Sequence, residues 1–389
     1  MSHRYRLAPT GDQESVLRVH VGQARFVWNL ALEQCEHARS LGCYADQKVW
    51  DRQLAEARRE VDWLGAGSSS VQQAALRDLR QAFRNWWSNP AHFGYPRRRK
   101  HGVSEGFAVR DLKLRVLSRK WAAVAVPKCG YVKFRLSRPV PTDAKSARVT
   151  LDRSGRWHVS IVAVPDQVDG PGTGEVVGVD RGVAVTAALS TGEMLHAPLP
   201  DRARRARLQR RFARQQKGSN RRARTKHRLA KLAAQEADRR RDWIEKTTTD
   251  IARRFDIVRI EDLNVANMVR SASGTVEEPG VNVAQKRGLN RSIAEQSWGM
   301  FARRLGDKIG DRLETVPAAF TSQRCHECGH TAAASRDGQS RFCCVACGHT
   351  ANADVNAARN IAAGLAVCGR GGLPLGGSVK RQPSLVGAA

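Results

Sequence analysis

The 389-residue sequence predicts a multi-domain α+β protein. Three observations support this fold class. A helical pattern fills the first quarter, and short β-like segments replace it after residue 90. A polar, glycine-rich stretch at 166–174 (DQVDGPGTG) then marks the best domain boundary. Two cysteine pairs near the C-terminus precede a last apolar helix. A chain of this length can hold two or three domains.

The composition points to a polyanionic partner. Lys and Arg number 66 against 37 acidic residues, which gives a net charge of +29 and a pI near 10.8. Neutralising phosphates would release counterions and drive binding to nucleic acid. The chain has nine cysteines, most of them clustered near the C-terminus, and they fit a metal site in a reducing compartment better than a disulfide framework. With no apolar run of membrane length and no secretory signal, we expect no membrane partner and a cytoplasmic protein.

The first elements read as a strand followed by helices. Residues 5–7 form the strand, and the Thr10 to Gln13 stretch matches a capping box that opens a helix. Helical spacing continues through residues 71–87, with a break at 65–67, so we assign 11–89 to a helical domain. Trp86 and Trp87 are more consistent with core packing than with a base-stacking platform.

Short strands with turns between them predict a small β-barrel from residues 1–10 and 90–167. It contains a basic turn at 96–100 and strands at 112–117, 122–126, 132–136, 147–151 and 157–164.

The second half, 175–320, begins with three strands at 176–180, 183–189 and 193–196. A basic helical segment at 201–241 follows, and then an apolar strand at 255–260. After the metal-type segment at 321–350 come a helix at 352–365 and a Gly/Pro/Ser-rich tail at 366–389, which we expect to be disordered.

Three acids in this order suggest a nuclease-type site. Asp180 ends the first of these strands, Glu261 follows the strand at 255–260, and Asp354 lies in the first turn of the last helix. A strand meander, a further strand and a returning helix are the order of an RNase H-like fold, whose carboxylates share two Mg²⁺ or Mn²⁺ ions. Taken singly, each acid has an ordinary reading as a turn, cap or helix-dipole residue. The hypothesis therefore depends on all three together.

A second metal signal lies between 321 and 350. Cys325 and Cys328, then fifteen residues, then Cys344 and Cys347 match the spacing of a zinc ribbon with one structural Zn²⁺. Cys343 in place of Cys344 would leave three residues before Cys347, whereas the ribbon spacing has two. Three nearby histidines could also coordinate zinc, but the four-cysteine site does not need them: His326, His330 and His349. We assign no metal or catalytic role to the remaining cysteines, Cys35, Cys43, Cys129 and Cys368.

The segment 201–241 holds 17 Lys or Arg and only three acidic residues, too few for pairing along a helix. We therefore favour a phosphate-contacting element over a solvated charged face. Its candidate nucleic-acid contacts are Arg210, Arg211, Arg214, Lys217, Arg221, Arg222, Arg224, Lys226 and Arg228.

The chain resembles the TnpB family of transposon-encoded, RNA-guided nucleases related to type V CRISPR effectors. The resemblance runs from about residue 5 to about residue 364 and rests on YRLAPTGDQESVLRVHVGQARFVWN, GVDRGVAV, KGSNRRARTKHRLAKL, RIEDLNVANM, TSQRCHECGH and CVACGHTANADVNAARNIAAG. It implies a wedge-type β-barrel with a helical recognition insertion, then a RuvC nuclease domain of RNase H-like fold with a zinc-ribbon insertion. It also implies that Asp180, Glu261 and Asp354 are the catalytic acids and that the four cysteines hold zinc.

The resemblance further implies an RNA-guided DNA endonuclease that works with a noncoding guide RNA, probing target DNA beside a short adjacent motif. Guide pairing would supply sequence choice. The resemblance also implies a prokaryotic, nucleoid-associated protein, and we expect a monomeric protein in a ribonucleoprotein. Two other functions stay open from the residues: a guide-dependent DNA-binding regulator without cleavage, and an RNase H-like transposase.

Overall fold

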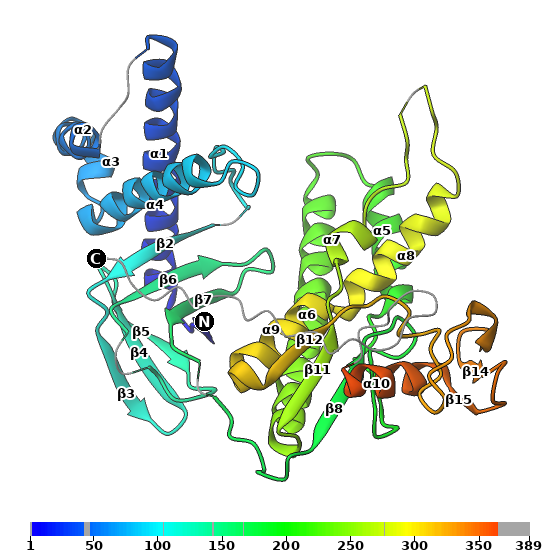
Figure 1. Ribbon diagram of the computed structural model, residues 1–389. Coiled ribbons are helices and arrows are strands. Elements are labelled where there is room, and N and C mark those ends of the chain that lie inside the picture. Colours follow the sequence, from blue (N-terminus) through cyan, green and yellow to red (C-terminus); the bar gives the residue numbers. More distant parts are fainter. Residues whose placement is uncertain are drawn as a thin grey trace. The chain divides into compact units, whose positions relative to one another are not determined.

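The computed structural model describes residues 2–42, 47–103, 105–141, 144–165, 167–275 and 277–364 (Figure 1). It divides into two compact units, described separately below. The first contains the residues up to 165 together with 201–235, and the second contains 166–200 and the residues from 236 onward. None of the described helices is both long and apolar enough to span a bilayer. The predicted tail at 366–389 lies outside the described residues.

The first unit combines helices with two sheets. Its elements are β1 (Ser2–Arg6), α1 (Gly11–Ser40), α2 (Gln47–Glu60), α3 (Asp62–Gly65), α4 (Ser69–Ser88), β2 (Glu105–Arg110), β3 (Leu114–Ser118), β4 (Trp121–Val126), β5 (Gly130–Arg135), β6 (Ser146–Leu151), β7 (Trp157–Val162), α5 (Arg202–Arg214) and the first part of α6 (Asn220–Arg254).

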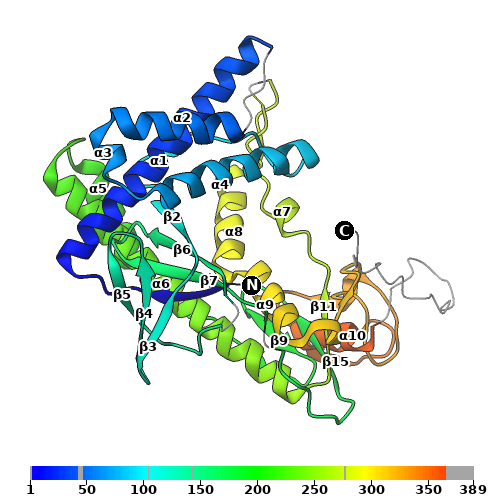
Figure 2. The ribbon, with the colours of Figure 1, turned by 90° about the vertical axis from the view of Figure 1, so that its left-hand side faces the viewer.

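The predicted helix start is confirmed. The Thr10 hydroxyl accepts from the N–H of Gln13 while the Gln13 side chain accepts from the N–H of Thr10, which is the complete capping box. The predicted break also appears, since α3 ends at Gly65 and α4 begins at Ser69. Figures 1 and 2 show α4 crossing α1, and the two helices are in contact.

The strands pair in a four-stranded sheet of order β1-β7-β6-β2 and a three-stranded sheet of order β3-β4-β5. A single bridge between Leu7 and Phe134 joins the two sheets. All strands predicted between 112 and 164 are present within a few residues of the predicted ends, whereas β2 was not predicted.

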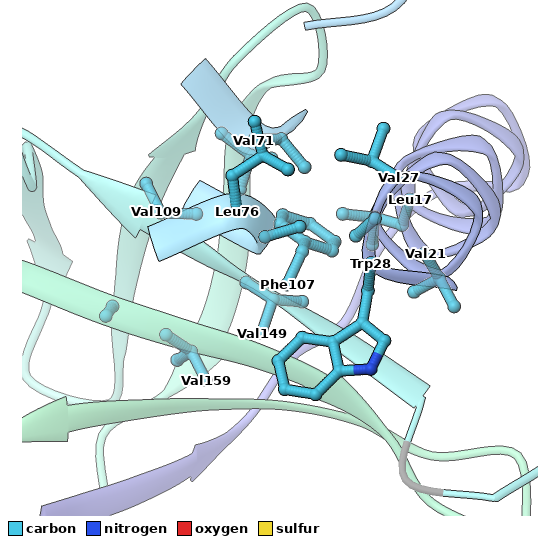
Figure 3. Close-up of a cluster of buried hydrophobic side chains, with 14 of the residues drawn as sticks. Leu17, Val21, Val27, Trp28, Val71, Leu76, Phe107, Val109, Val149 and Val159 are labelled. Carbon is cyan, nitrogen blue, oxygen red and sulfur yellow. The ribbon is translucent and has the colours of Figure 1, made fainter. Parts of the chain in front are cut away.

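One hydrophobic core joins these helices and sheets. Figure 3 shows side chains from α1, α4, β2, β6 and β7 converging, and the members it labels are Leu17, Val21, Val27, Trp28, Val71, Leu76, Phe107, Val109, Val149 and Val159. The buried Trp28 indole satisfies its N–H on the carbonyl of Arg97, 3.0 Å away.

The prediction that both tryptophans of α4 pack in the core is wrong for Trp87. Its side chain is 58% exposed and stacks on Phe83, while Trp86 is half-buried at the edge of the core. Consecutive helix residues point about 100° apart, so two adjacent tryptophans cannot both face one core.

The basic segment is helical as predicted, but it forms two helices, and the second runs on to Arg254. Asp201 caps α5 by accepting from the N–H of Arg204 at 2.9 Å. Residues 201–235 group with the first unit, although they were predicted to belong to the second half. The division between the units falls within α6.

The second unit contains the rest of α6 and a mixed sheet of order β10-β9-β8-β11-β12. Its other elements are β8 (Val176–Asp180), β9 (Ala187–Leu189), β10 (Met194–Leu195), β11 (Ile257–Glu261), α7 (Val265–Met268), α8 (Val283–Gln296), α9 (Trp298–Ile309), β12 (Leu313–Val316), β13 (Arg336–Asp337), β14 (Arg341–Cys343), β15 (Thr350–Asn352) and α10 (Ala353–Ala363).

The predicted meander is present, because β8, β9 and β10 pair antiparallel in sequence order. The strand predicted at 183–189 is shorter, since 183–186 form bends and only 187–189 pair. The strand predicted at 255–260 begins at Ile257 and includes Glu261, and it runs parallel to both β8 and β12. The segment predicted as a ribbon forms its own sheet, β13-β14-β15.

Candidate active site and metal centre

Two of the predicted acids lie side by side at one edge of the mixed sheet. The parallel strands β8 and β11 are in register, with Val179 opposite Ile260. The next residues, Asp180 and Glu261, therefore end adjacent strands at the same edge. Parallel pairing places the carboxyl ends of both strands at one edge of the sheet. The sequence alone does not show which strands pair, so it could not place these two acids side by side.

Helix α10 brings the third acid to this edge. A Cβ atom on Gly178 would lie 2.0 Å from the carbonyl oxygen of Ala358, so only glycine permits this close approach of helix and strand. Gly178 and Asp180 share one face of β8, while Asp354 and Ala358 share one face of α10. The same contact therefore carries Asp354 toward Asp180, and Figure 1 shows α10 beside β8. Asn352 fixes the start of the helix by accepting from the N–H groups of Asp354 and Val355.

The three acids also influence one another electrostatically. Burial raises the pKa of Asp180 to about 7, and the charges of Glu261 and Asp354 act in the same direction. Burial also raises the pKa of Glu261 and of Asp354. Without a cation the site disfavours its own negative charge, which is the environment expected of carboxylates that bind metal ions.

Two arginines at the site were not predicted. The Arg336 guanidinium lies 3.8 Å from the Asp354 carboxylate and opposes the raised pKa of Asp354. The buried Arg181 donates to the backbone carbonyl of Glu261. Arg181 follows Asp180 directly and could have been singled out as a charge beside an acid. Arg336 comes from the ribbon, and no local pattern links it to Asp354.

The spacing of the acids limits how cations could bind. Among the described residues, two groups of three or more His, Cys, Asp or Glu have all their ligand atoms within 4.8 Å of one another: the four ribbon cysteines, and His326 with Glu327 and His349. The three acids do not form such a group. One ion with oxygen ligands at about 2.1 Å would need them closer, whereas two ions about 3.5–4 Å apart could share them.

The four predicted cysteines form one cluster. The sulfur of Cys325 lies 3.8 Å from that of Cys347, and the sulfur of Cys328 lies 3.6 Å from that of Cys344. A tetrahedron with Zn–S distances of about 2.3 Å has sulfur–sulfur edges of about 3.8 Å, so the cluster fits zinc.

Each cysteine pair sits on the same type of turn. The N–H of Gly329 donates to the Cys325 carbonyl, and the N–H of Gly348 donates to the Cys344 carbonyl, both at 2.9 Å. Both glycines have φ near +75°, which explains why glycine follows each pair. Cys343 lies in β14 and outside the cluster, in agreement with the four-cysteine assignment.

The basic segment is largely exposed. Every one of its nine candidate residues is exposed except Arg222, whose guanidinium stacks on the Phe212 ring at 3.8 Å and donates to the carbonyls of Phe212 and Gln215. Arg222 therefore closes the α5–α6 turn. A cavity of about 420 Å³ lies beside α5 and α6, lined by Arg204, Arg207, Leu208, Arg211 and Arg228. Arg211 and Arg228 were among the predicted nucleic-acid contacts, whereas Arg204 and Arg207 were not.

Three family models match parts of the chain. A model described as "Probable transposase" matches residues 160–272, and one described as "Cas12f1-like, TNB domain" matches 298–361. A third, described as "Helix-turn-helix domain", matches 1–42. In the described part of that range, the structure has β1 and the single uninterrupted helix α1.

Relatives match over nearly the whole length. The chain is 38% identical to the "Putative RNA-guided DNA endonuclease InsQ" of Escherichia coli (strain K12), over 98% of this chain and 96% of that protein. It is 32% identical to a protein of Streptomyces pristinaespiralis with the same description but without the name InsQ, over 95% and 90%. Among solved structures, a Cas12f1-sgRNA-target DNA complex matches with a TM-score of 0.51 at 14% identity, over 91% of this chain and 83% of that one, which shows a similar fold. From the identity over nearly full length, the chain belongs to the TnpB family.

Proposed function

We propose that this protein is an RNA-guided DNA endonuclease with one active site, built from Asp180, Glu261 and Asp354. The observation that carries the proposal is the convergence of three acids with raised pKa values at the edge of the mixed sheet, where Glu261 is buried and Asp180 and Asp354 are half-buried. The relatives described as RNA-guided DNA endonucleases support the same activity.

The donor set fits hard divalent cations such as Mg²⁺ or Mn²⁺, because all three side chains offer carboxylate oxygens. Two such ions, when bound, supply an activated water and neutralise the leaving oxygen of a phosphodiester. The chain's own groups orient this site. Arg181 holds the backbone of Glu261, and Arg336 places a positive charge beside Asp354, where it can also approach a phosphate.

The four cysteines would hold one structural Zn²⁺ with no position left for substrate. The sheet order β10-β9-β8-β11-β12, with its antiparallel meander and parallel second half, supports an RNase H-like RuvC domain. The two sheets joined at Leu7 and Phe134 support a wedge-type barrel. The helices α1 to α4 would be the recognition insertion in that barrel.

The exposed arginines of α5 and α6 would contact phosphates of the guide RNA or of the target DNA. Among the described residues, Arg204, Arg207, Arg211 and Arg228 form no ion pair with an acidic side chain, so their charge is available to a polyanion. Guide pairing, with the protein reading backbone and shape, would then select the DNA.

The first experiment is to express the gene with its native flanking DNA, purify the protein and sequence the RNA that comes with it. A discrete RNA with a constant part and a variable end is expected, and its variable end names the DNA target to test. Heterogeneous RNA, or none, would contradict guide dependence.

The second experiment tests the site with Asp180→Ala. Loss of target cleavage with unchanged RNA content is the expected result. A cleavage-competent variant would overturn the assigned site. Wild-type protein that binds the target without cutting it would favour a regulator, and products joined to a second DNA would favour the transposase suggested by the name of one matching family model.

A further inference from the structure

The Glu261 carboxylate has a hydroxyl partner outside the three acids. The Thr321 hydroxyl donates to Glu261 Oε1, and Thr321 is only 3% exposed. The same hydroxyl lies 3.2 Å from the Ala318 carbonyl, but it carries a single proton. A charged carboxylate is the stronger acceptor, so the proton belongs to the bond with Glu261.

Two asparagines of α10 hold Thr321 in place. Asn360 Nδ2 donates to the Thr321 carbonyl at 2.9 Å and to the Arg324 carbonyl at 2.7 Å. Asn356 Nδ2 also donates to the Arg324 carbonyl at 2.7 Å, and its Oδ1 accepts from the N–H of His326 at 3.1 Å. Both amides thus bind the backbone of the segment 321–326.

These asparagines lie on one face of the helix, because Asn352, Asn356 and Asn360 recur every four residues. Asn356 is 0% exposed and Asn360 is 3% exposed. A buried amide is costly unless its hydrogen bonds are made, and here each amide satisfies backbone groups that helix and sheet leave open. An apolar residue in place of either asparagine would leave those carbonyls unpaired. The two asparagines therefore fix the position of the segment 321–326 as well as filling space.

We propose that Thr321 is a positioning residue for Glu261, held by Asn356 and Asn360. Thr321 occupies Oε1 and leaves Oε2 oriented for a cation, as outer partners of metal-binding carboxylates do. Since α10 also carries Asp354, one helix would set the positions of two of the three acids. Arg324 directly precedes Cys325, so the same segment links the cysteine cluster to the acids. This inference rests on the proposed function of Glu261 as a cation ligand.

Thr321→Val tests the proposal, because it removes the hydroxyl and keeps the shape. Mn²⁺ binding by calorimetry on the RNA-bound protein is expected to weaken about tenfold or more. The Mg²⁺ concentration for half-maximal cleavage should rise in parallel, with zinc content and RNA content unchanged. Thr321→Ser keeps the donor and should restore Mn²⁺ binding. Thr248→Val is the matched control, since Thr248 is also buried and hydrogen-bonded in the same unit but contacts none of the acids.

Wild-type Mn²⁺ affinity in Thr321→Val would overturn the positioning role, and so would a Thr321→Ser variant as impaired as Thr321→Val. Glu261→Gln separates this failure from failure of the site itself. If Glu261→Gln still cleaves, the assigned site is wrong. If Glu261→Gln is inactive while Thr321→Val binds Mn²⁺ normally, only the proposed role of Thr321 is contradicted.

Discussion

Among single residues, Asp180 illustrates how a proposed catalytic group can lower the stability of the fold. Its half-buried carboxylate lies near two other acids, and the rise of its pKa to about 7 means that folding disfavours the charged form. A raised carboxylate pKa makes the folded state bind more protons than the unfolded chain, so this group lowers stability as pH rises through neutrality. A cation would relieve that penalty.

Asp180→Asn should therefore stabilise the protein while abolishing cleavage. In buffer at pH 8 without added Mg²⁺ or Mn²⁺, and with zinc retained, we expect a gain of about 1–2 kcal/mol in the free energy of unfolding. Denaturation by urea measures the free energy of unfolding of both proteins. Added Mg²⁺ should reduce the difference between them, because it binds and stabilises only the wild-type site. A variant less stable than wild type would show that the Asp180 charge is already compensated in the fold.

Asp152 is the opposite case, a carboxylate whose charge stabilises its surroundings. It accepts from the N–H groups of Ser154 and Arg156, from the Ser154 hydroxyl and from the side chains of Arg156 and His158. These bonds outweigh burial and hold the pKa of Asp152 well below its usual range. The stabilisation is complete above the unfolded pKa and is lost as pH falls through the folded one.

Asp152→Asn should cost about 1–3 kcal/mol at pH 7, because a charged acceptor of several bonds is lost. The difference from wild type should shrink below about pH 4, where the unfolded carboxyl protonates. Urea denaturation between pH 3 and 7 checks this. A difference that stays constant over that range would contradict a charge-based role for Asp152.

The sequence identifies the three acids and the four cysteines but not the residues that support them. Acids at element ends and paired cysteines are local patterns, and the structure brings these residues near one another. Arg336 and Thr321 depend on partners 18 and 60 residues away, Asp354 and Glu261. Nothing in the local sequence marks such pairs, so only the folded chain reveals them.

At the level of elements, the contact between α10 and β8 positions the candidate site. Gly178→Ala would place a methyl group 2.0 Å from the Ala358 carbonyl, so the helix must move. We expect a loss of about 1–3 kcal/mol in stability, and a larger fractional loss of cleavage because Asp354 moves with the helix.

Gly288→Ala provides the matched control for that substitution. Gly288 lies inside α8, and an added Cβ would meet nothing within 4 Å. Alanine should therefore stabilise this helix by about 0.5–1 kcal/mol and leave cleavage unchanged. Thermal denaturation measures the stability of both variants, and a cleavage assay measures their activity. Equal effects of the two substitutions would argue against close packing at Gly178.

The predicted zinc site can be tested by replacing one of its cysteines. Cys325→Ser should release zinc and unfold the small sheet β13-β14-β15 locally, because a structural zinc site depends on all four thiolates. Elemental analysis should find about one zinc per chain in the wild type and almost none in the variant. Cys343→Ser removes a sulfur one residue from Cys344 and should keep the zinc. Loss of zinc in Cys343→Ser would contradict the four-cysteine assignment.

Strands were easier to predict than their pairing. Alternation and turns located the strands of the first unit, but β2 lies in a stretch with a weaker pattern and was missed. Likewise, the strand at 255–260 was predicted, but its place between β8 and β12 was not. Pairing between segments far apart in sequence is decided by packing of the whole unit, which periodicity does not encode.

At the level of the whole molecule, the net charge of +29 has to act through particular side chains. In the described residues, many arginines are used internally. Arg222 closes a turn, and Arg312 donates to the carbonyls of Phe255 and Asp256 near the end of α6. The arginines around the cavity beside α5 and α6 have no such role and remain available for phosphates.

Replacing Arg211 and Arg228 by Gln should therefore weaken RNA binding with little change in melting temperature. Each phosphate contact contributes about one unit to the slope of log affinity against log salt, so the double variant should have a slope smaller by about two. Arg18→Gln is the control, because Arg18 is exposed in the same unit but is already paired with Glu14 at 2.5 Å. Fluorescence titration of labelled RNA over a range of salt concentrations measures both slopes. An unchanged slope in the double variant would exclude phosphate contacts at this cavity, whereas equal losses in the control would mean that only the overall charge matters.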